Sequence, residues 1–313
     1  MRPEIANQTK ICPLCGSGKF GLRYPSTISR SRSSNQKGCY CCTSHELSQH
    51  GDIVRCEECG MVFNHPKPDG DELRHIYQQV EDPLYLEEQD ARKRTFQRSL
   101  DQLHGFASPP GNLLDVGCYT GVFMEMAAAH GWKVEGVELS QWAVTVARKT
   151  GVGPVYDQPL DGLNLSAERY EAITLWDVIE HLIDPAAMIA EVHRLLTPGG
   201  VLALSTHMID SWAARILGTR YPFFMEMHTV HFSRRTIRRL LESQGFEVLA
   251  IKPHHRVLRL GYVLEKLYHS VPFPLIRWLS KKGWIADRFI RIGVLGLVNV
   301  YARKKNESGR DSV

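Results

Sequence analysis

The middle of the chain alternates short apolar runs with segments that have helical spacing of apolar residues. The strand-like runs are 112–117, 133–140, 170–176 and 201–207. The helix-like segments that follow them include 121–132, 140–151 and 185–200. Strands that alternate with helices predict an α/β fold: a doubly wound, mostly parallel sheet with helices on both faces. In such a sheet, ligands bind at the carboxyl ends of the strands.

Pro and Gly residues near position 70 separate this region from an N-terminal unit. Two helix-like segments then lead into the main domain, which closes with a strand near 293–305. We expect a small N-terminal unit at 1–68, a helical linker at 69–110, the main domain at 111–305 and a tail at 306–313.

The composition is that of a soluble globular protein, with 43% hydrophobic and 23% charged residues among 313. Residues 1–10 lack the apolar core of a signal peptide. The longest uncharged apolar run, 292–302, is about half of what spans a bilayer. These features predict a cytoplasmic protein. A net charge of +4 makes no strong case for a nucleic-acid partner.

A basic, amphipathic segment precedes the last strand. Between Lys252 and Lys305, twelve Lys and Arg are opposed only by Glu265 and Asp287, and Trp278 and Trp284 lie among them. We expect helices at about 252–290, inserted before the final strand. They either pack on the domain or form a dimer, or the stretch 252–291 contacts an anionic membrane at its inner face.

Seven of the eight cysteines precede residue 60, and four form two C-x-x-C-G knuckles: "CPLCG" at 12–16 and "CEECG" at 56–60. A two-residue spacer lets both thiolates of a knuckle reach one ion, and the Gly frees the backbone to turn beneath it. The pattern resembles a zinc ribbon with a long polar insertion. It implies a structural Zn²⁺ held by Cys12, Cys15, Cys56 and Cys59, while a role of the ribbon in recognition stays open.

Three further cysteines, Cys39, Cys41 and Cys42, lie in the insertion. They could bind a second ion together with His45 or His50, but their spacing fits no metal motif. We expect surface thiols in a flexible loop.

The stretch "LLDVGCYTGVF" at 113–123 indicates a ligand pocket. Gly117 and Gly121 permit a tight turn between strand and helix, where free backbone N–H groups favour an anionic group. The next strand ends in Glu138, which suits the hydroxyls of a ribose. Asp115 would repel a pyrophosphate but can pair with an amino group. An amino-acid head with a ribose and an adenine fits all three, and S-adenosylmethionine (SAM) is such a ligand.

Several motifs together resemble the class I SAM-dependent methyltransferases, which have a Rossmann-like fold. They are "LLDVGCYTGVF", "GVELS", "LWDVIEHLIDP", "LTPGGVLALSTH" and "HFSRRTIRRLLESQGFEV", over roughly residues 80–251. The resemblance implies that SAM is bound by Asp115, Gly117, Cys118, Tyr119, Thr120, Gly121, Glu138, Leu139, Asp157, Trp176 and Asp177. Tyr119 replaces the commoner Gly of this loop, and we expect it to cover the cofactor.

The candidate chemistry lies at the end of the fourth strand, in "LWDVIEHLIDP". Glu180 and His181 could form a base and its orienting partner, or could cap the next helix. Similar Glu-His pairs occur in O-methyltransferases of the ubiquinone-biosynthesis type. His228 and His231 are three residues apart, and would share one face of a helical turn. They could bind a metal, although we expect one to touch substrate and the other to pack.

The sequence therefore predicts a methyltransferase acting on a small molecule or a lipid-linked or glycan precursor. Oxygen is the expected methyl acceptor, with carbon next. The alternative is an RNA methyltransferase that uses the zinc ribbon to recognise RNA. The mild charge and the absence of an Asn/Asp-Pro-Pro-Tyr signature after the fourth strand argue against it.

Overall fold

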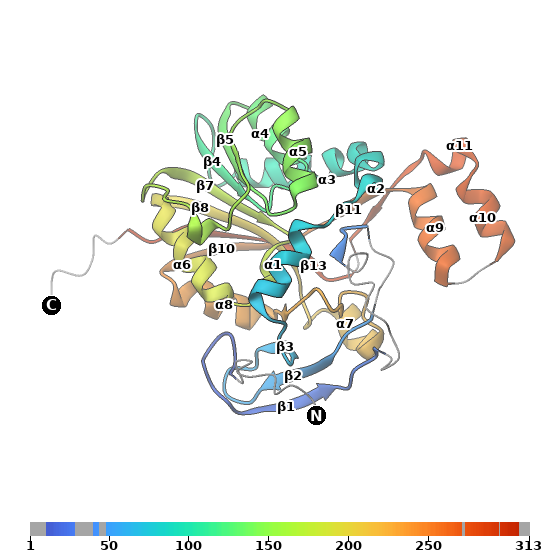
Figure 1. Ribbon diagram of the computed structural model, residues 1–313, viewed down its shortest axis with the longest axis horizontal. Helices are drawn as coiled ribbons and strands as arrows, with labels where there is room; N and C mark the ends of the chain where they lie inside the picture. Colours follow the sequence, from blue (N-terminus) through green and yellow to red (C-terminus); the bar gives the residue numbers. More distant parts are fainter. Residues whose placement is uncertain (1–10, 29–39, 44–47, 271–272, 294, 307–313) are drawn as a thin grey trace.

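A computed structural model describes residues 11–28, 40–43, 48–270, 273–293 and 295–306. Its centre is a seven-stranded sheet with the order β10-β13-β8-β7-β4-β5-β6 (Figure 1). The strands are β4 (Gly111–Val116), β5 (Trp132–Val137), β6 (Val155–Tyr156), β7 (Tyr170–Trp176), β8 (Leu196–His207), β10 (Phe246–Pro253) and β13 (Leu297–Lys304). Strands β4 to β8 pair in parallel, and β13 is antiparallel to both neighbours. The predicted α/β, doubly wound fold is confirmed.

Helices cover both faces of the sheet (Figure 1). On one face lie α3 (Gln89–His104), α4 (Val122–Ala129) and α5 (Gln141–Lys149), and on the other α6 (Pro185–Leu195) and α8 (Arg234–Ser243). Local signals fix where the helices begin, because Ser140 and Ser233 each accept a backbone hydrogen bond as N-cap residues.

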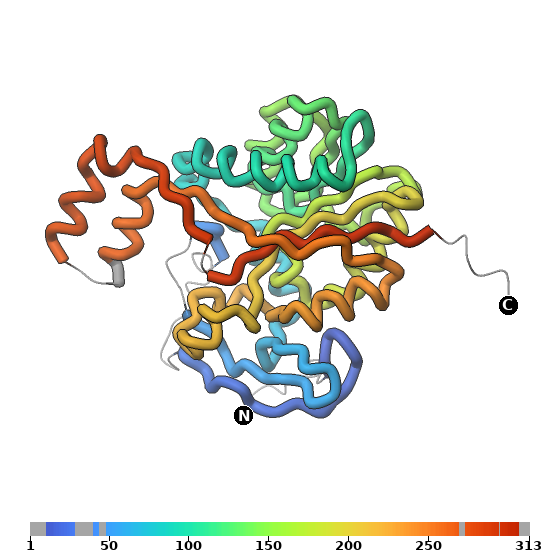
Figure 2. The backbone as a smooth tube through the Cα atoms, turned by 180° about the vertical axis from the view of Figure 1, so that it is seen from behind, coloured from blue at the N-terminus to red at the C-terminus, as the bar shows by residue number. Residues whose placement is uncertain are grey.

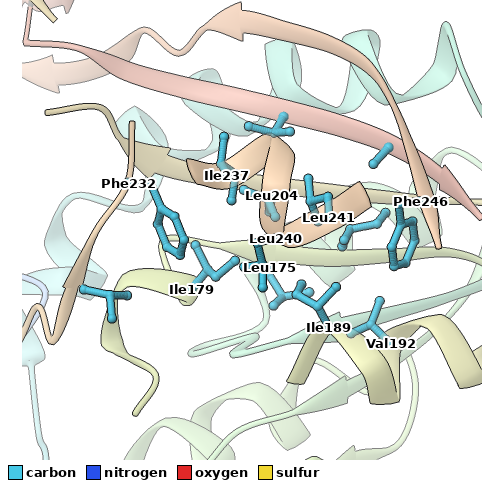
Figure 3. Close-up of a cluster of buried hydrophobic side chains, with 14 of the residues drawn as sticks. Leu175, Ile179, Ile189, Val192, Leu204, Phe232, Ile237, Leu240, Leu241 and Phe246 are labelled. Atoms are coloured by element: carbon cyan, nitrogen blue, oxygen red, sulfur yellow. The ribbon is translucent and has the colours of Figure 1, made fainter. Parts of the chain in front are cut away.

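The core beneath α6 and α8 is continuous and fully buried (Figure 3). Leu175 and Leu204 project from the sheet, Val192 comes from α6, and Leu240 and Phe246 come from α8 and the strand after it. Each large side chain of this kind contributes about 1.5–3 kcal/mol when removed from water. This packing fixes the loops at the carboxyl ends of β7 and β8.

The N-terminal unit forms a second sheet that includes a strand of the main domain. Its strands are β1 (Phe20–Tyr24), β2 (Asp52–Cys56), β3 (Val62–His65) and β9 (Val230–His231), in that order. Val62 pairs with His231 and Phe63 with Val230. Buried residues of β2 and β3 join the same core cluster as the central sheet. The two sequence units are therefore joined through backbone hydrogen bonds and a common core.

The linker and the C-terminal insertion complete the chain. The linker contains α1 (Gly70–Gln78) and α2 (Pro83–Glu87), and α7 (Trp212–Leu217) follows β8. The insertion comprises β11 (Arg256–Arg259), α9 (Leu260–Ser270), α10 (Pro274–Ser280), α11 (Gly283–Ala286) and β12 (Phe289–Ile292). As expected, these helices precede the last strand.

The helices of the insertion project away from the central sheet on the stem formed by β11 and β12 (Figures 1 and 2). Their described surface carries large exposed apolar side chains, among them Trp278 and Trp284. Across the parts of the chain that the structure describes, none of the helices has the length and apolar character needed to traverse a bilayer.

Candidate functional site

The turn between β4 and α4 requires glycine at two positions. Gly117 has φ = +74°, and a Cβ there would lie 2.5 Å from Cγ2 of Val178. Gly121, at φ = +80°, directly precedes α4. L-residues with side chains rarely adopt such angles. The turn thus brings backbone close to the pocket at the carboxyl end of β4, where the sequence predicted it.

Asp115 lies at the end of β4 and is buried. Its Oδ1 accepts a hydrogen bond of 2.6 Å from Oγ1 of Thr174. Burial raises the pKa of the Asp115 carboxyl to about 7. A nearby cation, such as the ammonium group of an amino acid, would favour its ionised form. Asp115 is thus placed to respond to a charged amino group.

Tyr119 adopts a left-handed conformation, with φ = +48°. Its backbone N–H donates to Oε2 of Glu138 at 3.0 Å. Its ring packs edge-on against Tyr85 and Trp142, with centroids 4.4 and 5.9 Å away. The phenol oxygen is buried and has no hydrogen-bond partner among the described residues. The Tyr119 ring therefore packs over the turn, and its phenol oxygen is available to a ligand.

Glu138 follows β5 and organises the loop around it. Its Oε1 accepts hydrogen bonds from the backbone N–H groups of Leu139 at 2.7 Å and Ser140 at 2.8 Å. Burial is the main cause that raises the pKa of Glu138 above its ordinary value, and the three backbone N–H bonds oppose it. The carboxylate still has lone pairs that can accept from hydroxyl groups.

Other predicted cofactor residues occupy different surroundings. The Cys118 and Trp176 side chains belong to the core cluster under α3 and α4. Thr120 is buried, and its hydroxyl has no partner among the described residues. Asp157 pairs with Arg148 across 3.4 Å at the partly exposed edge beyond β6. Cys118 and Trp176 therefore support the pocket from beneath.

Asp177 follows β7 and anchors the insertion to the site. It has φ = +55°, and its Oδ1 accepts from Oγ of Ser205 at 2.7 Å. Its Oδ2 forms an ion pair with Arg256 of β11. Burial alone would raise the pKa of the Asp177 carboxyl, but the charge of Arg256 holds it well below its ordinary value. Asp177 is therefore a carboxylate at neutral pH.

His181 ends a short 3₁₀ turn, Ile179–His181, after β7. Its Nδ1 lies 2.9 Å from the hydroxyl of Tyr77 and 3.0 Å from the carbonyl oxygen of Met227. A carbonyl only accepts, so Nδ1 carries the hydrogen and Nε2 keeps its lone pair. The hydrogen bonds of His181 at Nδ1 thus run to Tyr77 and Met227, rather than to Glu180 as the sequence suggested.

The pair His228 and His231 does not share a helical turn, because His231 lies in strand β9. His231 is buried between Nε2 of His207 and Oδ1 of Asn64, each at 3.0 Å. Nδ1 of His228 donates to the carbonyl oxygen of Phe223 at 2.7 Å, and the ring centroid of His228 lies 4.8 Å from that of His181. His231 is therefore a packing residue, and His228 faces the candidate catalytic histidine.

Burial sets the protonation of this histidine cluster. It lowers the pKa of His181 to about 4, and it lowers the pKa values of His207, His228 and His231 well below their ordinary range. Burial, and then the charge of Asp177, raises the pKa of Glu180 to about 8. At neutral pH the cluster thus consists of neutral imidazoles beside a protonated carboxyl group.

One carboxylate oxygen and two imidazole nitrogens, from Glu180, His181 and His228, lie within 4.8 Å of one another. Such a donor set could hold a divalent cation if Glu180 lost its proton. Its buried Oε2 has no hydrogen-bond partner among the described residues.

A short segment of the N-terminal unit contacts the linker near His181. Thr43 donates to Asp82 through its hydroxyl at 2.5 Å and its backbone N–H at 3.0 Å. The ring of Tyr40 packs edge-on against Tyr77, with centroids 5.6 Å apart. Residues 40–43 of the N-terminal unit therefore pack against the linker that carries Tyr77, the hydroxyl of which contacts His181.

The four knuckle cysteines converge as the spacing predicted. Sγ of Cys12 lies 3.5 Å from that of Cys59, Sγ of Cys15 lies 3.6 Å from that of Cys56, and all four are within 4.8 Å. Four zinc–sulfur bonds of about 2.3 Å in a tetrahedron would place the sulfurs about 3.8 Å apart. Backbone N–H groups of Leu14 and Met61 point to two of the sulfurs. The cluster fits a zinc ion.

Of the other cysteines, Cys41 is half-buried and donates to the carbonyl of Glu81 at 3.4 Å, whereas Cys42 is exposed. Cys39 and His45 lie outside the described residues. Neither described thiol joins a metal-ligand cluster in the parts of the chain that the structure places.

Sequence reasoning missed the residues that come from elsewhere in the chain. Tyr77, Tyr85 and Arg92 belong to the linker segments, and Arg256 belongs to the insertion. The site therefore draws on distant segments as well as on the loops after β4, β5 and β7. The sequence showed the basic run that contains Arg256, but it did not show that Arg256 pairs with Asp177.

The family model described as "Methyltransferase domain" matches residues 85–251. The chain is 31% identical over 156 residues to a ubiquinone biosynthesis O-methyltransferase of Coxiella burnetii, which covers 46% of this chain and 67% of that protein. It is 30% identical over 134 residues to a protein of the same name from Serratia proteamaculans, covering 40% and 56%.

A solved structure, the S-adenosylmethionine dependent methyltransferase from Mesorhizobium loti, is 18% identical with a TM-score of 0.45, over 67% of this chain and 97% of that one. The family match itself spans more than half of the 313 residues and contains the glycine turn, Glu138 and the Asp177–His181 segment. The chain belongs to the methyltransferase domain family and is a SAM-dependent methyltransferase.

Proposed function

We propose that the enzyme methylates an oxygen atom of a small-molecule or lipid-linked acceptor. The observation that carries the proposal is the neutral imidazole of His181, fixed directly after β7 with Nε2 unprotonated. Methylation of a hydroxyl requires a proton acceptor as the new carbon–oxygen bond forms. The relatives named as ubiquinone biosynthesis O-methyltransferases add support.

In this proposal each residue near the acceptor has a separate role. Nε2 of His181 takes the hydroxyl proton, while Tyr77 and Met227 hold the ring. The pKa of about 4 keeps the imidazole free of a proton above roughly pH 5, and it also makes His181 a weak base. A weak base suits an acidic hydroxyl, such as a phenol, better than an alcohol.

In this proposal, residues at the carboxyl ends of β4 and β5 bind SAM. Asp115 pairs with the amino group of SAM, Glu138 accepts from its ribose hydroxyls, and Tyr119 covers it. SAM supplies the methyl group when it is bound. The chain holds the acceptor oxygen in line and removes its proton.

A labelled-methyl assay tests the reaction. Labelled SAM is offered with phenolic lipids, glycolipid precursors or RNA, and the product is analysed by mass spectrometry. We expect label as a methyl ether on a small molecule or lipid. His181→Gln should lower kcat by roughly 10²-fold with SAM affinity unchanged, whereas the exposed control His130→Gln should not. Label found in RNA, or on carbon, would overturn the proposal.

We further propose that the insertion binds an anionic membrane surface at its cytoplasmic face. Phe273, Leu275, Trp278 and Trp284 are exposed around α10 and α11, and Trp284 reaches 70% exposure. Cations interleave with these side chains: Nζ of Lys282 lies 4.7 Å from the ring centroid of Trp278. Exposed aromatic residues among Lys and Arg suit a lipid headgroup region.

Vesicle sedimentation tests this contact. We expect binding to vesicles containing anionic lipid, weaker binding to neutral vesicles, and a decrease with added salt. The double variant Trp278→Ala/Trp284→Ala should lose binding. Leu22→Ala, at an exposed position on β1, should retain it. Self-association through these tryptophans without vesicle binding would assign the surface to a dimer instead.

We also propose that the four-cysteine cluster holds one structural Zn²⁺. All four ligands come from the protein, so no coordination position is left for catalysis. The sulfur atoms are mostly buried in the core that the two sheets share.

A further inference from the structure

A cavity between α3 and β11 opens onto the end of the central sheet. It is lined by Arg92, Thr95, Phe96, Asp177, Ser205, His254, Arg256, Val257 and Leu258. Thr95 ties its two walls together, because its Oγ1 accepts from the backbone N–H of Val257 at 2.8 Å. Asp177 and Ser205, at the ends of β7 and β8, form the floor. The cavity thus adjoins the position proposed for methyl transfer.

Two guanidinium groups line this cavity, and a third cation from another segment lies close enough to feel their charge. Arg92 comes from α3, and its guanidinium lies 3.5 Å from the ring centroid of Tyr85. Arg256 comes from β11 and is anchored by Asp177. Lys266 comes from α9, where its Nζ lies 5.0 Å from the ring centroid of Tyr262. Two of the three cations are therefore supplied by the insertion, whose stem β11 runs past α2 and α3 (Figure 1).

The carboxylates near Arg92 are engaged by other groups. Asp177 accepts from Ser205 as well as pairing with Arg256, and both oxygens of Asp82 accept from Thr43. Nε of Arg92 is buried without a hydrogen-bond partner among the described residues. A buried donor of this kind is unfavourable unless a ligand or a water molecule accepts its hydrogen bond.

The cationic charges of Arg92 and Arg256 act on the ionisable groups of α9 beside the cavity. Burial, and then the charges of Arg256 and Arg92, lowers the pKa of Lys266 to about 8, and Asp82 opposes them only in part. The same two guanidinium groups are the leading charges acting on the phenol of Tyr262. An anion between them would relieve this repulsion.

We propose that Arg92, Arg256 and Lys266 form a subsite for an oxyanion, a phosphate or a carboxylate, carried by the methyl acceptor. The inference rests on the proposed function, because the cavity is a specificity site only if the acceptor is a discrete molecule bound beside His181. Guanidinium groups bind such anions through paired N–H donors, and the ammonium group adds charge. The insertion would thereby favour methyl acceptors that carry an anionic group, in addition to the membrane contact proposed for its outer surface.

Titration of the SAM-saturated protein with inorganic phosphate, followed by ³¹P NMR, tests the subsite directly. We expect saturable binding that weakens with salt, and at least 5-fold weaker binding in Arg92→Met and in Lys266→Met. Arg94→Met is the matched control, because Arg94 lies on the same helix with its guanidinium over Phe289. Acetate should displace the bound phosphate, because the proposed subsite also takes a carboxylate.

The absence of phosphate and acetate binding by the wild-type protein would overturn the subsite, as would equal binding by both variants and the wild type. The SAM titration and the methyl assay are separate readouts. A protein that binds SAM and forms a methyl ether without binding either anion fails only this inference. A protein that binds phosphate at the subsite but methylates no oxygen would refute the proposed reaction and leave the subsite standing.

Discussion

The carboxylate of Glu138 accepts a hydrogen bond of 3.0 Å from the backbone N–H of Tyr119, which joins the loop after β5 to the turn after β4. The same carboxylate holds two N–H groups of its own loop. One side chain therefore fixes both loops of the proposed cofactor pocket, and it can do so only as a hydrogen-bond acceptor.

Replacement of Glu138 should weaken SAM binding without unfolding the protein. Glu138→Ala removes acceptors for the ribose and for three backbone N–H groups, and we expect a loss of at least 10-fold in SAM affinity by calorimetry. The SAM affinity of Glu138→Gln, which keeps one acceptor oxygen, should lie between those of the wild type and Glu138→Ala. Glu125→Gln, at a surface pair with Lys93, is the control. Unchanged affinity in Glu138→Ala would refute the assigned ribose contact.

SAM affinity should fall as the pH drops below about 7. Burial raises the pKa of Asp115 to about 7 in the free protein, and pairing with an ammonium group requires the ionised carboxylate. Below that pH the protonated Asp115 carboxyl group must lose its proton before it can pair with SAM, so SAM affinity decreases by up to about tenfold per pH unit. Calorimetry in buffers of different ionisation enthalpy should detect proton release on binding near pH 6.

Asp115→Asn provides the comparison for this pH dependence. The amide does not titrate, so its SAM affinity should be low and nearly constant between pH 6 and 8. A variant that kept the wild-type slope would show that another group is responsible.

Tyr77→Phe should slow methyl transfer while sparing SAM binding. The lost hydroxyl lies 2.9 Å from Nδ1 of His181, and without it only Met227 holds the ring at that nitrogen. Loss of such an orienting bond costs about 10-fold in kcat. The readout is kcat with KM for SAM measured alongside. A change in KM for SAM with kcat preserved would place Tyr77 at the cofactor instead.

Metal analysis should find one tightly held zinc per chain. Cys56→Ser or Cys59→Ser should abolish it and lower the thermal midpoint, because these side chains are buried in the shared core. Cys42→Ser, at an exposed thiol, should keep both the metal and the midpoint. Freshly purified protein free of zinc would contradict the assignment.

Local patterns were sufficient to predict the sheet, the glycine turn and the cysteine cluster. The signals for Gly117, Ser140 and the two cysteine knuckles lie within a few residues of the structure they specify. Glu138 could be placed for a similar reason, since the carboxyl ends of neighbouring parallel strands meet at one edge.

Contacts between distant segments could not be predicted in this way. Tyr77 precedes His181 by 104 residues, and Arg256 follows Asp177 by 79. Strand β9 is only two residues long, and its pairing with β3 is set by the packing of both sheets. The expected helical spacing of His228 and His231 was wrong because that strand pairing governs the backbone there.

The shared sheet gives the cysteine-knuckle unit an influence on the site that a module joined only by a linker would not have. β9 leads from the histidine-bearing loop into α8, and its edge is completed by β3. Removing the first sixty-five residues would leave Val230 and His231 as a bare strand edge beside the catalytic pocket. If the cluster holds the proposed zinc, scarcity of the metal would lower the number of working enzyme molecules and leave the turnover of each intact one unchanged.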